Sequence, residues 1–178
     1  MPGYDERKFT EALLYVAAAL ADDPAGGAVK INKALFNADF GHMRAYGQPI
    51  TGADYQKLPY GPAPRRLLPA RSALIESGAA EMREELYLGR TVKRLVALRE
   101  PDVSRFSPSE LAMLDQAIEA EKRRSGSEAS AVSHREPGWQ IVEENESIPY
   151  ETAFLRQPVV TERVRRRVAE LAAERSLS

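Results

Sequence analysis

The chain has 178 residues, of which 43% are hydrophobic and 29% are charged, so it can bury one sizeable core in water. Its 25 Lys and Arg residues nearly balance 26 Asp and Glu residues, which argues against a protein that acts mainly by neutralising phosphates. The absence of cysteine excludes disulfides and thiol chemistry, and the lack of a signal peptide or bilayer-length apolar run predicts a cytoplasmic protein without membrane contact.

Two helices are predicted before residue 47. The apolar residues of the first recur at helical spacing: Phe9, Leu13, Val16 and Leu20. This pattern ends at residues 22–27, which contain two aspartates, a proline and two glycines. A second helical pattern covers about residues 29–45, and Gly47 is placed to end it.

The segment from Gly47 to Pro64 is rich in residues that interrupt regular structure. It carries four prolines and two glycines after Gly47, too many for a helix interior or a central strand. We therefore predict a short edge hairpin and an ordered loop. Pro64 stands where a third helix could begin; this helix would run to Gly78 and be bent by Pro69.

The second half of the chain predicts a hairpin followed by helices. Residues 81–98 suit two strands joined by a turn at Gly89. Ser107, Pro108 and Glu110 form a capping-box pattern that starts a helix, which continues to a break at residues 125–127 and a short helical piece at 129–133. Residues 161–175 read as an amphipathic terminal helix. The predicted fold is a single compact, mainly α domain with one or two short β-hairpins.

Several of these pieces occur in an order typical of one family. They are residues 30–40 (KINKALFNADF), residues 47–52 (GQPITG), Tyr55, residues 60–62 (YGP) and residues 133–139 (SHREPGW). Together they resemble the Panacea family, the SocA-like antitoxin domain, over roughly residues 5–155, with an extension from 158 to 178.

The resemblance implies a mostly helical antitoxin that neutralises, by direct contact, a protein toxin usually encoded by an adjacent gene. One family member is an adaptor that delivers its toxin to a protease.

Six residues are candidates for contact with a partner: Tyr55, Tyr60, Pro62, Arg65, Arg66 and Arg71. Prolines fix a loop in advance and so lower its ordering cost on binding, and Tyr and Arg are frequent interface anchors. The alternative is purely structural. The glycines and prolines would then only set turns, the tyrosines would cover the core, and the arginines would lie on an exposed helical face.

Three further residues are predicted to be structural: Asp39, His134 and Trp139. Asp39 and His42 are three residues apart, but a metal site needs a third ligand, so a polar pair in the core is the better interpretation. We expect His134 and Trp139 to pack as a corner against the second helix, with His134 bonded to backbone or to Asp39. No catalytic or phosphate-binding motif is present, which predicts a protein that is not an enzyme and needs no metal or cofactor.

The main alternative function is a winged-helix-like DNA-binding regulator. The third helix, the hairpin of residues 81–98 and the arginines at 163 and 165–167 favour it. Glu162, Glu170 and Glu174 intersperse those arginines, as in a solvated helix, so we place DNA second, as an autoregulatory partner of an antitoxin.

Overall fold

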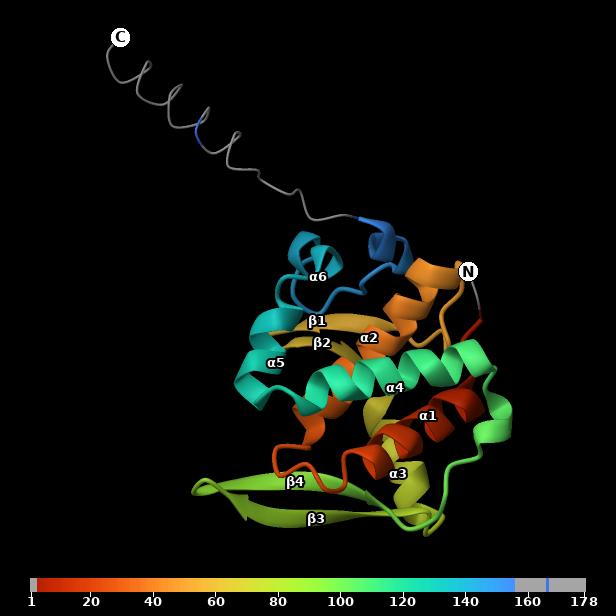
Figure 1. Ribbon diagram of the computed structural model, residues 1–178, viewed down its shortest axis with the longest axis vertical. Coiled ribbons are helices and arrows are strands. Elements are labelled where there is room, and N and C mark those ends of the chain that lie inside the picture. Colours follow the sequence, from red (N-terminus) through yellow and green to blue (C-terminus); the bar gives the residue numbers. More distant parts are fainter. Residues whose placement is uncertain (1–2, 156–165, 167–178) are drawn as a thin grey trace.

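The computed structural model describes residues 3–155 and residue 166. Its elements in chain order are α1 (Glu6–Ala19), α2 (Ala28–Tyr46), β1 (Tyr55–Leu58), β2 (Gly61–Pro64), α3 (Leu67–Glu76), β3 (Ala80–Tyr87), β4 (Arg90–Ala97), η1 (Val103–Arg105), α4 (Pro108–Lys122), α5 (Gly126–Ser133), α6 (Pro137–Ile141) and η2 (Tyr150–Phe154). The prediction of a mainly α fold with two small hairpins is confirmed (Figure 1). The predicted helix over 161–175 and the extension from 158 to 178 lie outside the described residues.

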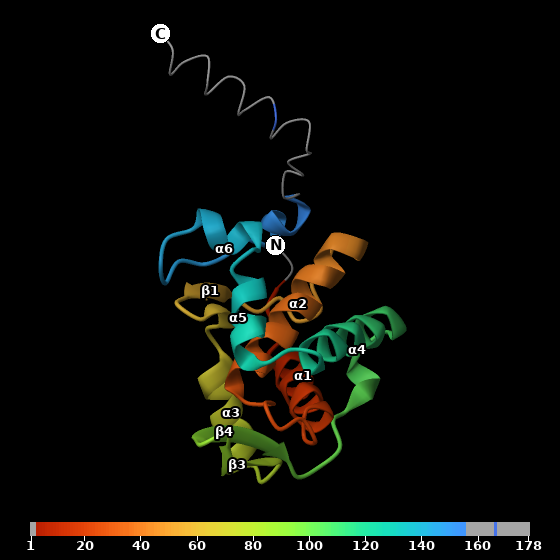
Figure 2. The ribbon, with the colours of Figure 1, turned by 60° about the vertical axis from the view of Figure 1, so that its left-hand side comes forward.

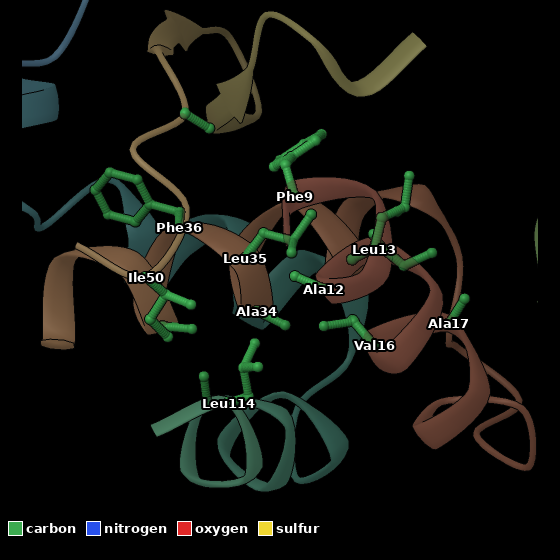
Figure 3. Packing of buried hydrophobic residues seen from close by; sticks show 14 of the residues in the cluster. Phe9, Ala12, Leu13, Val16, Ala17, Ala34, Leu35, Phe36, Ile50 and Leu114 are labelled. Atoms are coloured by element: carbon green, nitrogen blue, oxygen red, sulfur yellow. The ribbon is translucent and has the colours of Figure 1, made fainter. Parts of the chain in front are cut away.

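The core forms where α1, α2 and α4 pack together. Val16 of α1 and Ala34 of α2 are fully buried and meet Leu114 of α4 (Figure 3). Helix α2 is central, because it contacts α1, α4, α5, β2 and η2. At Gly41 a Cβ atom would lie only 2.8 Å from Met113 Sδ, so the missing side chain allows α2 and α4 to approach closely.

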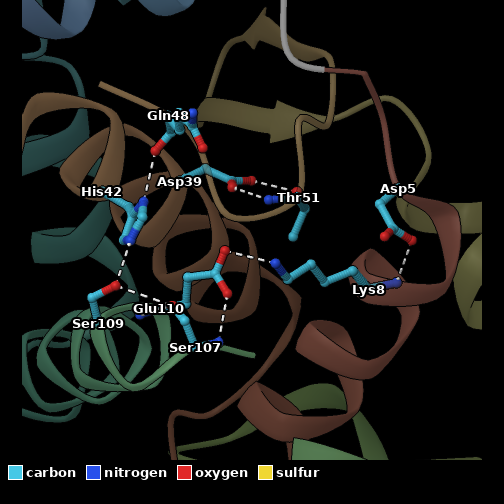
Figure 4. A network of polar contacts seen from close by, with 9 residues as sticks. All are labelled: Asp5, Lys8, Asp39, His42, Gln48, Thr51, Ser107, Ser109 and Glu110. Atoms are coloured by element: carbon cyan, nitrogen blue, oxygen red, sulfur yellow. Dashed lines mark hydrogen bonds and ion pairs between the residues drawn. The ribbon is translucent and has the colours of Figure 1, made fainter. Parts of the chain in front are cut away.

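Helix ends follow local chemistry that the sequence signals. Gly47 ends α2 in the left-handed conformation at φ 75°, as predicted. The capping box of Ser107 and Glu110 starts α4, and Glu110 also accepts a bond from Lys8 Nζ at 2.6 Å, which ties α1 to α4 (Figure 4).

Two predicted helix boundaries need correction. Pro64 is the last residue of β2, and α3 begins at Leu67, so Pro69 lies in its first turn, where a backbone N–H is not needed. The predicted break after α4 is present but lies at residues 123–125, and the short helix expected at 129–133 already begins at Gly126, because Ser125 and Glu128 form a second capping box.

The first hairpin is not a free edge. Strand β1 pairs antiparallel with β2, from Tyr55 opposite Pro64 to Leu58 opposite Gly61. Its other side bonds to residues 145–148, through Lys57 N to Glu146 O at 3.0 Å and Ile148 N to Tyr55 O at 2.7 Å. The predicted edge hairpin is therefore covered on both sides of β1, by a segment far away in the sequence.

The second hairpin is longer and confirms the two strands expected over residues 81–98. Strands β3 and β4 pair from Ala80 opposite Ala97 to Tyr87 opposite Arg90, and their distal end extends beyond the helices (Figure 1). At the turn, Leu88 is 83% exposed and adopts φ 47°. Within the described residues, no helix is both long enough and apolar enough to span a bilayer.

Candidate functional site

The turn between β1 and β2 presents one aromatic side chain on a rigid backbone. Tyr60 is 74% exposed at this turn. Three alternate backbone carbonyls accept hydrogen bonds from three helices: Leu58 O from Trp139 Nε1 of α6, Tyr60 O from Ser130 Oγ of α5, and Pro62 O from Lys33 Nζ of α2, each at 3.1 Å. The turn is therefore held in one conformation by tertiary bonds and does not depend on its two-strand ladder alone.

Gly61 is required beside Tyr60 for two reasons. Its φ of 100° lies in the region that side chains avoid. A Cβ atom at this position would also collide with Ser133 Oγ and lie 2.6 Å from Lys33 Nζ. The YGP motif therefore pairs an exposed tyrosine with a glycine seated directly on α2 and α5.

Lys33 brings a buried positive charge under the turn. Its side chain is 2% exposed, and burial lowers the pKa of its ammonium group to about 8. Glu121 of α4 is fully buried nearby and opposes this shift, while burial raises the pKa of its own carboxyl group. Asn37 Nδ2 and Arg124 Nη1 donate to Glu121 Oε1 at 3.1 and 2.7 Å. This polar cluster joins α2 and α4 beneath the hairpin.

Asp39 anchors the chain that leads into β1. It is 1% exposed, and it accepts bonds from Thr51 N at 2.7 Å and Thr51 Oγ1 at 2.6 Å (Figure 4). It also accepts a bond from Tyr55 Oη at 2.7 Å. Burial raises the pKa of the Asp39 carboxyl group, although the bonds from Thr51 and Tyr55 oppose that shift. The predicted structural role of Asp39 thus consists of fixing the start of the hairpin to α2.

His42 and Asp39 are both buried polar residues, but they hold different segments. His42 Nδ1 lies 2.6 Å from Gln48 O, which makes this nitrogen the donor, and Nε2 lies 3.2 Å from Ser109 Oγ (Figure 4). His42 therefore joins α2 to the following loop and to the start of α4. Among the described residues, no group of three His, Cys, Asp or Glu side chains could hold a metal ion.

The predicted corner of His134 and Trp139 is present, but one of its bonds is not. The two rings stack with centroids 4.2 Å apart, and Lys57 Nζ lies 4.5 Å from the Trp139 ring centroid. The Trp139 indole bonds to β1, so the corner supports the hairpin. Of the two partners predicted for His134, backbone or Asp39, the Asp39 alternative is wrong, because Asp39 takes its bonds from Thr51 and Tyr55, while His134 Nε2 is buried without a described hydrogen-bond partner.

Two of the six predicted contact residues are core residues. Tyr55 is 1% exposed, its ring packs edge-on against Phe36 and Phe40, and burial raises the pKa of its hydroxyl well above the ordinary value. Pro62 is buried as well. Both side chains are therefore inaccessible to a partner in this fold. We therefore remove Tyr55 and Pro62 from the set of candidate contact residues.

The remaining four residues, Tyr60, Arg65, Arg66 and Arg71, are not equivalent. Arg65 and Arg66 are exposed, but Arg65 is held by Asp54 Oδ2 at 2.9 Å and Gln56 Oε1 at 2.7 Å. Arg71 is half-buried and lines a small, mostly apolar cavity between α1, α3 and the β3–β4 hairpin. Tyr60 and Arg66 are therefore the freely presented members of the predicted set.

Sequence reasoning missed the residues that support the turn. Lys33, Ser130 and Ser133 lie in helical segments whose local patterns do not distinguish them from surface positions. Two of them fall within the motif pieces at 30–40 and 133–139, so the motifs marked the right segments. Their function as supports depends on contacts across the fold.

The fold and the site together define a mainly helical domain that carries two β-hairpins and presents a rigid turn. The family model described as antitoxin SocA-like, Panacea domain, matches residues 31–140, and the chain belongs to this family. The match includes the turn and the three residues that donate to its carbonyls, Lys33, Ser130 and Trp139. Membership supports a role in toxin–antitoxin systems in general. Searches of curated proteins and of solved structures found no match.

Proposed function

We propose that this protein is an antitoxin that binds and neutralises a cognate protein toxin, and that Tyr60 is its central contact. The observation that carries the proposal is the 74% exposure of Tyr60 on a turn whose carbonyls are fixed from three helices. An exposed tyrosine on a rigid turn meets a partner with little loss of conformational entropy. Tyrosine is also among the residues that most often dominate binding energy at interfaces.

The mechanism that fits this surface is stoichiometric masking, with no chemical step. An exposed side chain on a fixed turn suits contact with a protein surface better than the binding of a small substrate, which needs a concave site. Covering the toxin's active site or substrate path would need roughly 1,600 Å² of total buried surface for a stable complex. We expect the toxin to be the product of an adjacent gene, as the family resemblance implies.

The test is co-expression with the adjacent gene product, followed by calorimetry on the purified pair. Tyr60→Ala should weaken binding by roughly 30- to 150-fold, as for an interface anchor worth about 2–3 kcal/mol, and should abolish growth rescue at low expression.

Tyr46→Ala is the matched control, because Tyr46 is 60% exposed at the end of α2. Circular dichroism should show both variants folded. Unchanged affinity in a folded Tyr60→Ala variant would contradict the contact at this turn, and absence of binding by the parent protein would contradict the antitoxin proposal.

One arrangement supports DNA as a second partner: α3 is followed directly by the β3–β4 hairpin, the order of a helix and wing. However, α3 exposes Leu68 and Ile75, and the hairpin end exposes Leu86 and Leu88, which are poor contacts for phosphates. A gel-shift series with increasing salt tests for DNA as a partner, since affinity for DNA would fall steeply as the salt concentration rises. Delivery of the toxin to a protease would keep the same contact and would appear as accelerated toxin degradation.

A further inference from the structure

The two outer edges of the β3–β4 hairpin differ in how they are covered. Arg94 of β4 donates to Leu20 O at 2.9 Å and to Pro24 O at 3.2 Å. A Cβ atom on Gly27 would lie 3.5 Å from Lys93 O, so the loop before α2 lies along the outer edge of β4. Helix α3 packs against the base of β3, but every β3 residue from Arg83 onward is exposed. In the part of the chain that the structure describes, β4 is the only strand that pairs with β3.

The register identifies the backbone groups that face outward on the exposed part of β3. Leu98 N donates to Ala79 O at 2.8 Å, so these opposite residues form a hydrogen-bonded pair. Along an antiparallel ladder, hydrogen-bonded and non-hydrogen-bonded pairs alternate. Glu84 and Leu86 lie an odd number of pairs further along, so they direct their backbone N–H and C=O groups away from β4. We call these groups the open edge; among the described residues they have no backbone hydrogen-bond partner.

The open edge ends beside two strongly exposed apolar side chains. Leu86 is 79% exposed and Leu88, in the adjoining turn, is 83% exposed. These are the highest exposures among the large apolar side chains that the structure describes. An exposed strand edge is a template for a further strand, and neighbouring apolar side chains add affinity to such pairing.

The charges along β3 define the chemistry of a strand that fits the open edge. The charged residues of β3 are Glu81, Arg83, Glu84 and Glu85. Three glutamates against one arginine leave an excess of negative charge. The Glu84 side chain is 64% exposed beside its 3.4 Å ion pair with Lys93, so a second cation can approach it. Opposite charges on facing residues stabilise strand pairing, so the open edge favours a strand with basic residues opposite Glu84 and Glu85.

A second copy of β3 has the wrong charges for this edge. Two identical antiparallel strands related by a two-fold axis place one residue opposite itself. In a pair centred on the exposed part of β3, that residue is Glu84 or Glu85, which brings like charges together. The complementary occupant is therefore a different protein with a basic strand.

A toxin contact at Tyr60 alone would be small. A tyrosine buries about 150–250 Å², whereas a stable complex needs roughly 800 Å² on each partner. The β1–β2 and β3–β4 turns lie on the same side of the molecule (Figures 1 and 2), so one partner can reach both.

We propose that the open edge binds an extended, basic strand of the cognate toxin by strand addition, with apolar toxin side chains on Leu86 and Leu88. This inference rests on the proposed antitoxin function and adds a second contact to that of Tyr60. Backbone hydrogen bonds supply affinity in this mode of recognition, and the facing side chains supply specificity.

Hydrogen exchange of single amides tests the proposal, on the full chain alone and in complex with the adjacent gene product. In the free protein the amides of Glu84 and Leu86 should exchange fast, while those of Arg83 and Glu85, which bond to β4, should exchange more slowly. In the complex, exchange at Glu84 and Leu86 should slow at least about tenfold, because both amides gain an acceptor. Unchanged exchange at these two amides in a complex that forms would overturn the strand contact and leave the antitoxin proposal standing.

A matched pair of variants tests the same bond through affinity. Glu84→Pro removes an outward N–H and leaves the ladder to β4 intact, since edge strands accept proline where the N–H faces solvent. Glu84→Ala removes the same charge and keeps the N–H. The proline variant should bind the toxin at least about tenfold more weakly than the alanine variant, because an acceptor on the toxin strand loses its donor. Equal affinities of the two variants, both folded by circular dichroism, would overturn the proposal.

Two further outcomes separate the partners. Slow exchange at Glu84 and Leu86 in the free protein, with a rate that depends on protein concentration, would overturn the proposal and assign the open edge to a second copy. Absence of any complex with the parent protein would contradict the antitoxin function and this inference together.

Discussion

The two hairpins of this protein share one topology but are stabilised in different ways. The β1–β2 hairpin has four residues per strand, and its backbone is bonded to α2, α5, α6 and residues 145–148. The β3–β4 hairpin has eight residues per strand; Arg94 donates to Leu20 O at 2.9 Å, and β4 meets the loop before α2 as far along as Val92, which lies beside Gly27. The shorter hairpin is thus part of the core, while the longer one relies on its own ladder toward the turn.

The difference shows what a rigid turn requires. An isolated two-stranded hairpin is marginal in water, so a turn that presents a side chain in one position needs bonds from outside the ladder. The β1–β2 turn receives them at three carbonyls, and its exposed residue is a tyrosine. Substitutions that disturb the β1–β2 hairpin should therefore alter the free energy of unfolding more than comparable substitutions in the β3–β4 hairpin.

The largest difference in the free energy of unfolding is expected between substitutions of two carboxylates, one that anchors the β1–β2 hairpin and one on β3. Asp39→Ala should lower the free energy of unfolding by about 3–5 kcal/mol, because it leaves the buried donors of Thr51 and Tyr55 unpaired. Glu84→Ala on β3 should cost at most about 0.5 kcal/mol, because its ion pair with Lys93 is exposed. Urea unfolding of both variants measures the contrast, and similar losses would show that the β1–β2 anchor is not special.

A smaller contrast is expected between the two turn glycines. Gly61→Ala should cost about 2–4 kcal/mol, because it adds a collision with Ser133 to the strain of a positive φ. Gly89→Ala should cost only about 1 kcal/mol, since no other atom lies within 4 Å of the added methyl group. Thermal unfolding compares them. A loss at Gly89 equal to that at Gly61 would mean that tertiary packing does not distinguish the turns.

The smallest expected effect is a gain in stability. Leu88 adopts φ 47° before Gly89, a turn position that favours asparagine. Leu88→Asn should therefore raise the free energy of unfolding by about 0.5–1 kcal/mol, while Leu86→Asn, on the strand, should not. Urea midpoints with unchanged slopes would verify this. A loss of stability in Leu88→Asn would indicate that the exposed leucine has contacts that stabilise the isolated domain.

Local patterns predicted most elements but not their surroundings. Apolar spacing located the first two helices, and the capping box located α4, because these signals depend only on nearby residues. The same reasoning overlooked the Ser125 capping box and placed a helix start at Pro64, since a proline suits both a strand end and a first helical turn. The order of the motif pieces identified the family correctly.

The sequence by itself determined the class of fold, the positions of both hairpins and the family, because periodicity, caps and turn residues act over short distances. Tertiary structure alone decided which hairpin residues are buried and which are exposed. Tyr55 and Tyr60 are five residues apart in one turn-rich segment, yet one binds Asp39 in the core and the other is exposed. That distinction arises because α2, α5 and α6 meet the hairpin from distant parts of the chain, and no local pattern encodes their approach.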